Sequence, residues 1–223
     1  MAARTRKQPQ AARTTRRPRG RPRDERKRSD IIAAARRIFF AADPRKLRME
    51  RIAREAGVSK ATLYAYFPNL TELLRAVIQD HRASMTRALD RLPQTTSDVR
   101  ASLVEFGTRL VEFLTSSETV ALQRMLAAEP SLRQRLGRLI YREGPETMRT
   151  KVARILSAAE ARGDLRPHDS QRAAEQLLGM WQGIVSIGLL IGGRPAPSRK
   201  ERERAVEHAV DVLLRAYGPS PNG

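Results

Sequence analysis

Residues 48–67 read RMERIAREAGVSKATLYAYF, which is the pattern of two short helices joined by a tight turn. Helical spacing places four apolar side chains on the faces where these helices meet, namely Ile52, Ala53, Leu63 and Phe67. Gly57 supplies the positive φ angle that a tight turn requires, and Ser59 is placed to cap the second helix. The segment therefore predicts a helix-turn-helix.

The second helix of this motif leaves a set of side chains on its outer face and at its N-terminal end. They are Lys60, Ala61, Thr62, Tyr64, Ala65 and Tyr66. A helix of this kind fits the major groove of double-stranded DNA, which is about 12 Å wide. The alternative is an unrelated pair of helices in an ordinary helical protein, because short motifs recur freely.

The run I-A-x-x-A-G-V-S-x-x-T-L-Y-x-Y-F resembles the DNA-binding signature of the TetR (tetracycline repressor) family of bacterial transcriptional regulators. The likeness extends from Glu25 to His81 without a gap. It implies that the sugar-phosphate backbone is contacted by Thr62, Tyr64 and Tyr66. It also implies that the residues nearest the base edges are Ser59, Lys60, Ala61 and Ala65. Lys60 is the best candidate for reading guanine, because its amine can donate to O6 and N7.

The sequence departs from this family pattern in several places. Family members commonly begin the first helix of the motif with Thr or Ser, where this chain has Leu47 and Arg48. The usual hydroxyl cap and its phosphate contact are therefore missing, and we expect Arg48 to contact the phosphate instead. Asp43 and Pro44 replace a usual Gly and aromatic residue, and Leu70 replaces a usual Lys.

A strongly basic segment precedes the motif. Residues 1–28 hold 12 Lys and Arg against two acidic residues. The net positive charge of this segment is over half of the formal net charge of +19 for the whole chain. We expect residues 1–24 to form a disordered arm, because they lack the apolar residues needed to offset ordering. Within it, residues 18–22 read PRGRP, similar to the AT-hook core that places two arginines, here Arg19 and Arg21, in a narrow minor groove. The alternative is a solvated basic tail that attracts DNA without sequence preference.

Composition narrows the remaining possibilities. The 223 residues contain no cysteine, which excludes disulfides, thiol nucleophiles and cysteine-ligated metal sites. The longest apolar run, residues 183–193, is shorter than the roughly 20 residues that span a bilayer, so we expect no membrane span. No apolar stretch follows the basic N-terminus as in a secretory signal, so we expect a cytoplasmic, nucleoid-associated protein.

Apolar spacing and Gly/Pro punctuation predict an all-α fold. The expected domains are a basic arm over residues 1–24, a DNA-binding domain over 25–85 and a helical regulatory and dimerisation domain over 86–218. The first helix is expected to be capped by Ser29 or Asp30 and to end before Asp43 and Pro44. The other helices are expected over residues 49–56, 60–67, 70–92, 97–115, 119–128, 132–141, 145–162, 169–191 and 199–216.

The resemblance also implies a homodimer formed by the last two helices. We expect this interface to include Leu178, Gly183, Val206, Val210, Leu213 and Leu214. A pocket for a lipophilic small molecule would be lined by Phe106, Leu110, Phe113, Met125, Tyr141, Met148, Trp181 and Val185. An ordinary core is the favoured alternative for each of these residues, and the sequence alone does not separate core from pocket.

No enzyme motif, metal-ligand cluster or cofactor-binding loop is visible, and His81, His168 and His208 are isolated in the sequence. The sequence therefore predicts a non-enzymatic, ligand-responsive repressor that binds a palindromic operator on double-stranded DNA as a homodimer. An architectural nucleoid-type protein dominated by the basic arm is the alternative. Binding to an acidic membrane surface is less favoured, because the basic run lacks an apolar face.

Overall fold

A computed structural model describes residues 21–41, 48–90 and 98–219, and all its regular elements are helices. They are α1 (Arg21–Ala41), α2 (Met49–Glu55), α3 (Lys60–Tyr66), α4 (Leu70–Asp90), α5 (Val99–Leu114), α6 (Ser117–Ala128), α7 (Pro130–Tyr141), the π-helical turn η2 (Arg142–Glu146), α8 (Thr147–Ala161), α9 (Ser170–Ile191) and α10 (Arg199–Tyr217). The expected all-α fold is confirmed.

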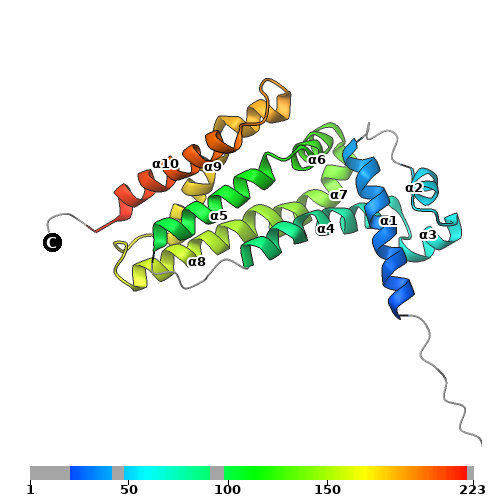
Figure 1. The fold of residues 1–223 in the computed structure, drawn as a ribbon, viewed down its shortest axis with the longest axis horizontal. Coiled ribbons are helices and arrows are strands. Elements are labelled where there is room, and N and C mark those ends of the chain that lie inside the picture. Colours follow the sequence, from blue (N-terminus) through cyan, green and yellow to red (C-terminus); the bar gives the residue numbers. More distant parts are fainter. Residues whose placement is uncertain (1–20, 42–47, 91–97, 220–223) are drawn as a thin grey trace, which may run out of the picture.

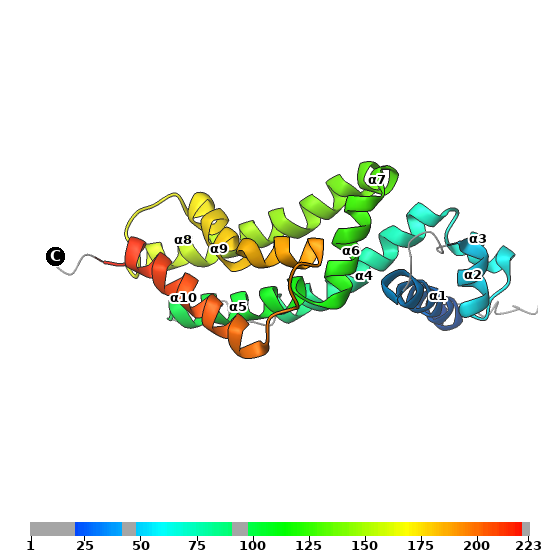
Figure 2. The same cartoon turned by 90° about the horizontal axis from the view of Figure 1, so that it is seen from above.

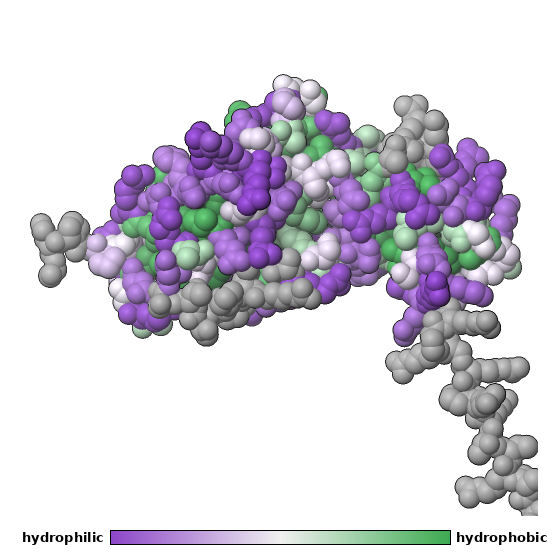
Figure 3. Space-filling view, in the orientation of Figure 1, coloured by the Kyte–Doolittle hydropathy of each residue, from purple (hydrophilic) through white to green (hydrophobic). Residues whose placement is uncertain are grey.

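The molecule is elongated, with two parts joined along α4. Helices α1 to α3 form a small head at one end, and α5, α8, α9 and α10 form the far end of the body, where the C-terminus lies (Figure 1). Helices α6 and α7 lie between these parts, next to the point where α1 meets α4 (Figure 2). Hydrophilic residues cover most of the face seen in Figure 3, with hydrophobic residues visible between the helices.

Two hydrophobic cores meet on α4. The N-terminal half of α4 contributes Leu74 and Ile78 to the core of the head, which also contains Leu122 and Met125 of α6 and Leu136 of α7. Its C-terminal half contributes Met85 and Leu89 to the core of the body. The expected domain boundary at residue 85 therefore falls inside a helix rather than in a linker.

Two expected helix boundaries are wrong. Helix α1 begins at Arg21, so Ser29 and Asp30 lie inside it and do not cap it. The sequence places Gly144 and Pro145 at a break, but the chain continues through the turn η2 into α8. Pro145 is tolerated there because a π-helical turn has already interrupted the regular i→i−4 bonds that proline would remove.

Helix α9 is kinked and has two apolar faces. Its kink is at Gly183, whose φ of 44° and ψ of −155° are available only to glycine without strain. Before the kink, Leu177 and Trp181 are buried in the body, whereas Ile184 and Ile187 after it are 76% and 56% exposed. Contrary to expectation, α9 is long and apolar enough to span a bilayer by length and composition. A single helix of this composition does not establish a membrane span, and the buried face of α9 packs against α8.

Candidate functional site

The turn between α2 and α3 is closed by two backbone hydrogen bonds. The N–H of Gly57 donates to the carbonyl of Arg54 at 3.2 Å, and the N–H of Val58 donates to the carbonyl of Ala53 at 2.9 Å. Gly57 has a φ of 64°, where a Cβ would strain the backbone. The expected role of Gly57 is confirmed.

Helix α3 is capped and anchored as expected. The hydroxyl of Ser59 accepts a hydrogen bond from the backbone N–H of Thr62 at 3.1 Å, and its oxygen lies 2.8 Å from the hydroxyl of Thr62. Leu63 is fully buried and Phe67 is 3% exposed, with the guanidinium of Arg28 on α1 5.4 Å from the centre of the Phe67 ring. The position of α3 on the head is thus fixed by both its cap and its inner face.

The outer face of α3 is open to solvent. The exposed predicted residues are Ser59, Lys60, Ala61, Tyr64 and Ala65. Thr62 and Tyr66 are half-buried, so they lie at the edge of this surface rather than at its centre. Arg48 is exposed at the N-terminus of α2 and makes no side-chain cap, which leaves its guanidinium available to an anion beside α3.

An ion pair that the sequence analysis missed lies on this surface. Lys60 Nζ is 3.6 Å from a carboxylate oxygen of Glu50, in the first turn of α2. A hydrogen bond from its own backbone N–H lowers the pKa of Glu50, and the charge of Lys60 lowers it further. A carboxylate therefore lies beside the lysine that was expected to read DNA. The spacing between positions 50 and 60 does not reveal this pair, because the turn sets the angle between the two helices.

Part of the expected AT-hook segment, including Arg19, lies outside the described residues. Arg21 and Pro22 form the first turn of α1, where proline is tolerated because its missing N–H has no intrahelical acceptor to lose. These two residues are therefore helical in this structure, which contains no DNA, and the AT-hook role remains a prediction. Helix α1 thus begins inside the expected arm and includes its last four residues, 21–24.

A buried cluster joins the head to the body. The ring of His81 on α4 is 3% exposed and stacks on Phe113 of α5, with their centres 4.7 Å apart. Its Nδ1 lies 2.9 Å from Glu118 of α6, and its Nε2 lies 3.0 Å from the hydroxyl of Thr119. A neutral ring with the proton on Nδ1 donates to Glu118 and accepts from Thr119. His81 is thus isolated in the sequence but not in the fold.

Arg36 of α1 completes this cluster. Its guanidinium donates to Glu118 at 2.6 Å and to Asp80 of α4 at 3.4 Å. Burial lowers the pKa of His81 and Arg36 adds to the effect, while Glu118 and Asp80 oppose it. Burial also raises the pKa of Glu118, but the hydrogen bond and charge of Arg36 outweigh it and lower that pKa overall. The cluster thus favours a neutral His81 beside an ionised Glu118.

This cluster predicts a pH-dependent stability. The unfolded chain binds a proton at His81 more tightly than the folded chain does. The contribution of His81 to the free energy of unfolding is therefore fully present above its ordinary pKa of 6.5. We expect the free energy of unfolding to fall as the pH drops from 6.5 towards the lowered pKa, and further once Glu118 is protonated. Urea unfolding at several pH values would measure this. The variant His81→Gln should flatten the dependence near pH 6; an unchanged slope would contradict the assignment.

The expected pocket residues have different surroundings in the structure. Four of them, Phe106, Leu110, Met148 and Trp181, are buried in the core of the body. Phe113 stacks on His81, Val185 is half-buried, and Tyr141 is 64% exposed. The structure thus favours the alternative of an ordinary core for most of them.

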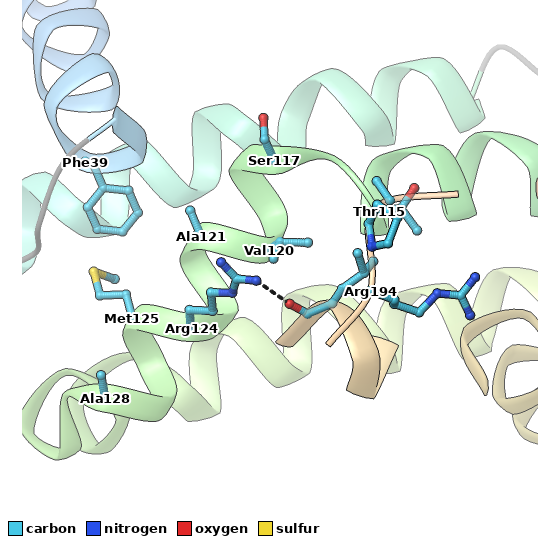
Figure 4. A pocket seen from close by; sticks show the side chains of 12 residues that line it. Phe39, Thr115, Ser117, Val120, Ala121, Arg124, Met125, Ala128 and Arg194 are labelled. Atoms are coloured by element: carbon cyan, nitrogen blue, oxygen red, sulfur yellow. Dashed lines mark hydrogen bonds between the residues drawn. The ribbon is translucent and has the colours of Figure 1, made fainter. Parts of the chain in front are cut away.

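Met125 lines a groove of about 600 Å³ where α1, α6 and the connection from α9 to α10 meet (Figure 4). We call it the junction groove. It is lined by Phe39, Thr115, Ser117, Val120, Ala121, Arg124, Met125, Ala128, Leu189, Arg194, Pro195 and Ala196. Sequence spacing missed this site because its residues come from three separated segments.

Three of the expected dimer residues lie inside the protomer. Val206, Val210 and Leu213 are at most 3% exposed, because the apolar stripe of α10 covers α5 and α9 of its own chain. Leu178 is 8% exposed, Leu214 is half-buried, and Gly183 is exposed at the kink. The exposed apolar residues of α9 are instead Met180, Ile184, Ile187, Leu190 and Ile191. Most of the expected interface residues on α10 are thus covered within the protomer, whereas this face of α9 is not, and the interface itself remains a prediction.

The described residues contain no group of three or more His, Cys, Asp or Glu side chains that could hold a metal ion.

Comparisons with known proteins agree with this geometry. Residues 31–77 match the family model of bacterial regulatory proteins of the tetR family, and residues 101–219 match the C-terminal domain of AefR-like transcriptional repressors. The HTH-type transcriptional regulator YdeS of Bacillus subtilis is 32% identical over 177 residues, which cover 78% of this chain and 84% of YdeS.

Solved structures extend the likeness to the whole fold. A TetR-family transcriptional regulator from Mesorhizobium loti has a TM-score of 0.80 at 28% identity and covers 89% of this chain and 100% of its own. The flavonoid-responsive regulator FrrA has a TM-score of 0.71 at 30% identity and covers 87% of this chain and 98% of its own. With a family model spanning more than half of its length and a helix-turn-helix of the required geometry, the chain belongs to the TetR family of DNA-binding transcriptional regulators.

Proposed function

We propose that the protein is a ligand-responsive repressor that binds a palindromic operator as a homodimer. The observation that carries this proposal is the outer face of α3, where Lys60, Ala61 and Tyr64 are exposed while Leu63 fixes the helix on the head. Lys60 would donate to a guanine, and the alanines would contact thymine methyl groups. Arg48, Thr62, Tyr64 and Tyr66 would hold the DNA backbone.

The dimer follows from the exposed face of α9. One head reads about half of a palindromic site, so two heads about one DNA turn apart are needed for a full site. Five large apolar side chains on one helix form a patch of the kind that marks protein interfaces, and a two-fold axis buries the same patch on both copies. Such burial also explains why α9 resembles a membrane-spanning helix in composition.

Release from DNA would follow from a population shift. A small lipophilic molecule that favours a state with the two heads too far apart would prevent both α3 helices from docking together. A coupling of about 1 to 3 kcal/mol changes affinity by 5- to 150-fold. The likeness to FrrA, which is named for its response to flavonoids, and to AefR-like repressors supports both the ligand and the repression.

The basic arm would add affinity. Arg19 and Arg21 would approach the minor groove beside the site that α3 reads, and the remaining arginines would attract phosphates. An architectural protein dominated by this arm is not favoured, because the matched relatives are transcriptional regulators.

Fluorescence anisotropy would test the proposal. The full chain and a chain lacking residues 1–22 are titrated at two salt concentrations with DNA from upstream of the protein's own gene and with shuffled DNA. We expect the upstream DNA to bind at least about a thousandfold tighter, and the shortened chain to keep this preference with lower affinity. Equal binding of both DNAs, lost on truncation, would instead favour the architectural alternative.

The Lys60–Glu50 pair gives a further prediction. The variant Glu50→Gln removes a negative charge beside the DNA and frees Lys60, so we expect up to about fivefold tighter binding to operator and shuffled DNA alike. Anisotropy at low salt would measure this. Glu55→Gln is the matched control, because Glu55 is on the same helix but pairs with Arg37 of α1. Equal effects of the two variants would show that the pair has no special role.

A further inference from the structure

The junction groove has the character of a site for an organic anion. Arg124 and Arg194 line it, and no aspartate or glutamate does. The rest of its lining is mostly apolar, with Phe39 of α1 and Met125 of α6 pointing towards one another at one end and the two arginines further along (Figure 4). An aromatic ring packs well against a phenyl ring and a thioether, and a carboxylate pairs well with guanidinium groups.

Arg124 is held in place by the fold, whereas Arg194 is an exposed side chain at the edge of the groove. Arg124 donates from Nη2 to the carbonyl of Leu189 at 2.6 Å and from Nε to the carbonyl of Leu190 at 3.1 Å, at the C-terminal end of α9. Its Nη1 remains as a donor, since guanidinium groups carry five N–H bonds. The stem of Arg194 lies over Gly188, where a Cβ would be only 2.6 Å from its Cγ and Cδ. A ligand would therefore meet the positioned guanidinium of Arg124 beside the exposed side chain of Arg194.

The groove also touches the parts that connect head and body. Phe39 and Met125 both belong to the core of the head, although Met125 lies on α6. Glu118, which pairs with Arg36 of α1, lies on the same helix α6. A molecule in the groove contacts α1 and α6 together, so it can stabilise one arrangement of head and body over another.

We propose that the junction groove binds an amphipathic organic anion, with a flat apolar body against Phe39 and Met125 and a carboxylate at Arg124 and Arg194. We further propose that this binding changes the affinity of the head for DNA, which rests on the regulatory function proposed above. The groove is separate from the core of the body, where the indole Nε1 of Trp181 is buried without a hydrogen-bond partner among the described residues. That core is the competing place for a ligand.

Titration calorimetry of the full chain with 2-naphthoate tests the binding. We expect one site per chain, and binding of the neutral analogue 2-naphthamide to be weaker by about tenfold or more, because a hydrogen bond to a charged group is lost. Equal binding of the acid and the amide would overturn the assignment of an anion site. So would the absence of naphthoate binding at millimolar concentration.

Three variants locate the site. Ala121→Trp fills the groove and Arg194→Met removes one charge, so both should weaken naphthoate binding by about tenfold or more. Arg154→Met removes an exposed arginine on α8, away from the groove lining, and should change nothing. Thermal unfolding by circular dichroism confirms that each variant is folded. Unchanged binding in both groove variants would place the ligand elsewhere, such as in the body core, and would overturn the proposal.

Two parallel measurements separate this proposal from the proposed function. Operator binding without ligand tests the function alone, and its absence would leave the naphthoate result standing. With operator binding intact, we expect naphthoate to lower DNA affinity by at least fivefold in the wild type but not in Ala121→Trp. No such difference would overturn the regulatory part. A change in oligomeric state on adding naphthoate, lost in Ala121→Trp, would show that the groove is an interface between copies.

Discussion

The double substitution Ile184→Asp with Ile187→Asp is expected to convert the protein into monomers and to weaken operator binding by at least about 100-fold. Both side chains are more than half exposed on α9, so the folded protomer loses little when they become charged. In a dimer built on this face, four carboxylates would be buried against apolar surface without partners. Each monomer would then bind a half-site alone, without the gain from two linked heads.

Light scattering coupled to size-exclusion chromatography would measure the mass, and anisotropy the DNA affinity. Gln134→Asp is the control for added negative charge, because it places one aspartate at an exposed position on α7 and should leave both measurements unchanged. The free energy of unfolding of the double variant, measured at low protein concentration, should stay near that of the wild-type protomer. A double variant that remains dimeric would show that α9 does not form the interface.

Helices α9 and α10 show which property of the dimer interface the sequence does not reveal. The apolar spacing of α10 predicts a buried stripe through Val206, Val210 and Leu213, and that stripe is indeed buried. Periodicity reports that a face avoids water, but not whether it packs on its own chain or on another copy. On α9, apolar residues occur on both sides of the kink, and the conformation of Gly183 decides which of them reach the surface.

The helix-turn-helix was predictable for a physical reason. Its decisive interactions lie within a few residues, since Ser59 caps the backbone of Thr62 and Gly57 closes the end of α2. Local interactions of this kind leave a mark at fixed spacing in the sequence. The boundaries of α4 and α9 were likewise predicted to within a few residues, because Pro and Gly punctuate both.

The junction between head and body was not predictable. His81, Arg36 and Glu118 come from three helices that are dozens of residues apart, and no spacing rule relates them. The junction groove has the same origin, since Phe39, Met125 and Arg194 meet only when the whole chain is folded. Sequence patterns identify elements and their faces, whereas sites between distant elements depend on packing.

The pair of variants Leu63→Ala and Tyr64→Ala gives the second large effect, because one of these neighbours on α3 is buried and the other is exposed. Leu63 is fully buried, so Leu63→Ala should lower the free energy of unfolding by about 2 to 5 kcal/mol through lost burial and the cavity left behind. Tyr64 is 45% exposed, so Tyr64→Ala should change that free energy by roughly 0.5 kcal/mol or less. Urea unfolding would measure both.

The effects of the two variants on DNA affinity should be the reverse of their effects on stability: Tyr64→Ala should weaken DNA binding more than Leu63→Ala does. Tyr64→Ala removes the contact that we propose with the DNA backbone and leaves the head folded, so its operator affinity should fall by about tenfold or more at every temperature at which it is folded. Leu63→Ala keeps every outer side chain of α3, so its affinity should approach that of the wild type under conditions that restore folding, such as a stabilising osmolyte. Consecutive residues on a helix are about 100° apart, so a rotation of α3 by one residue would move Tyr64 towards the buried position of Leu63. Equal loss of stability in the two variants would therefore mean that α3 presents a different face to DNA.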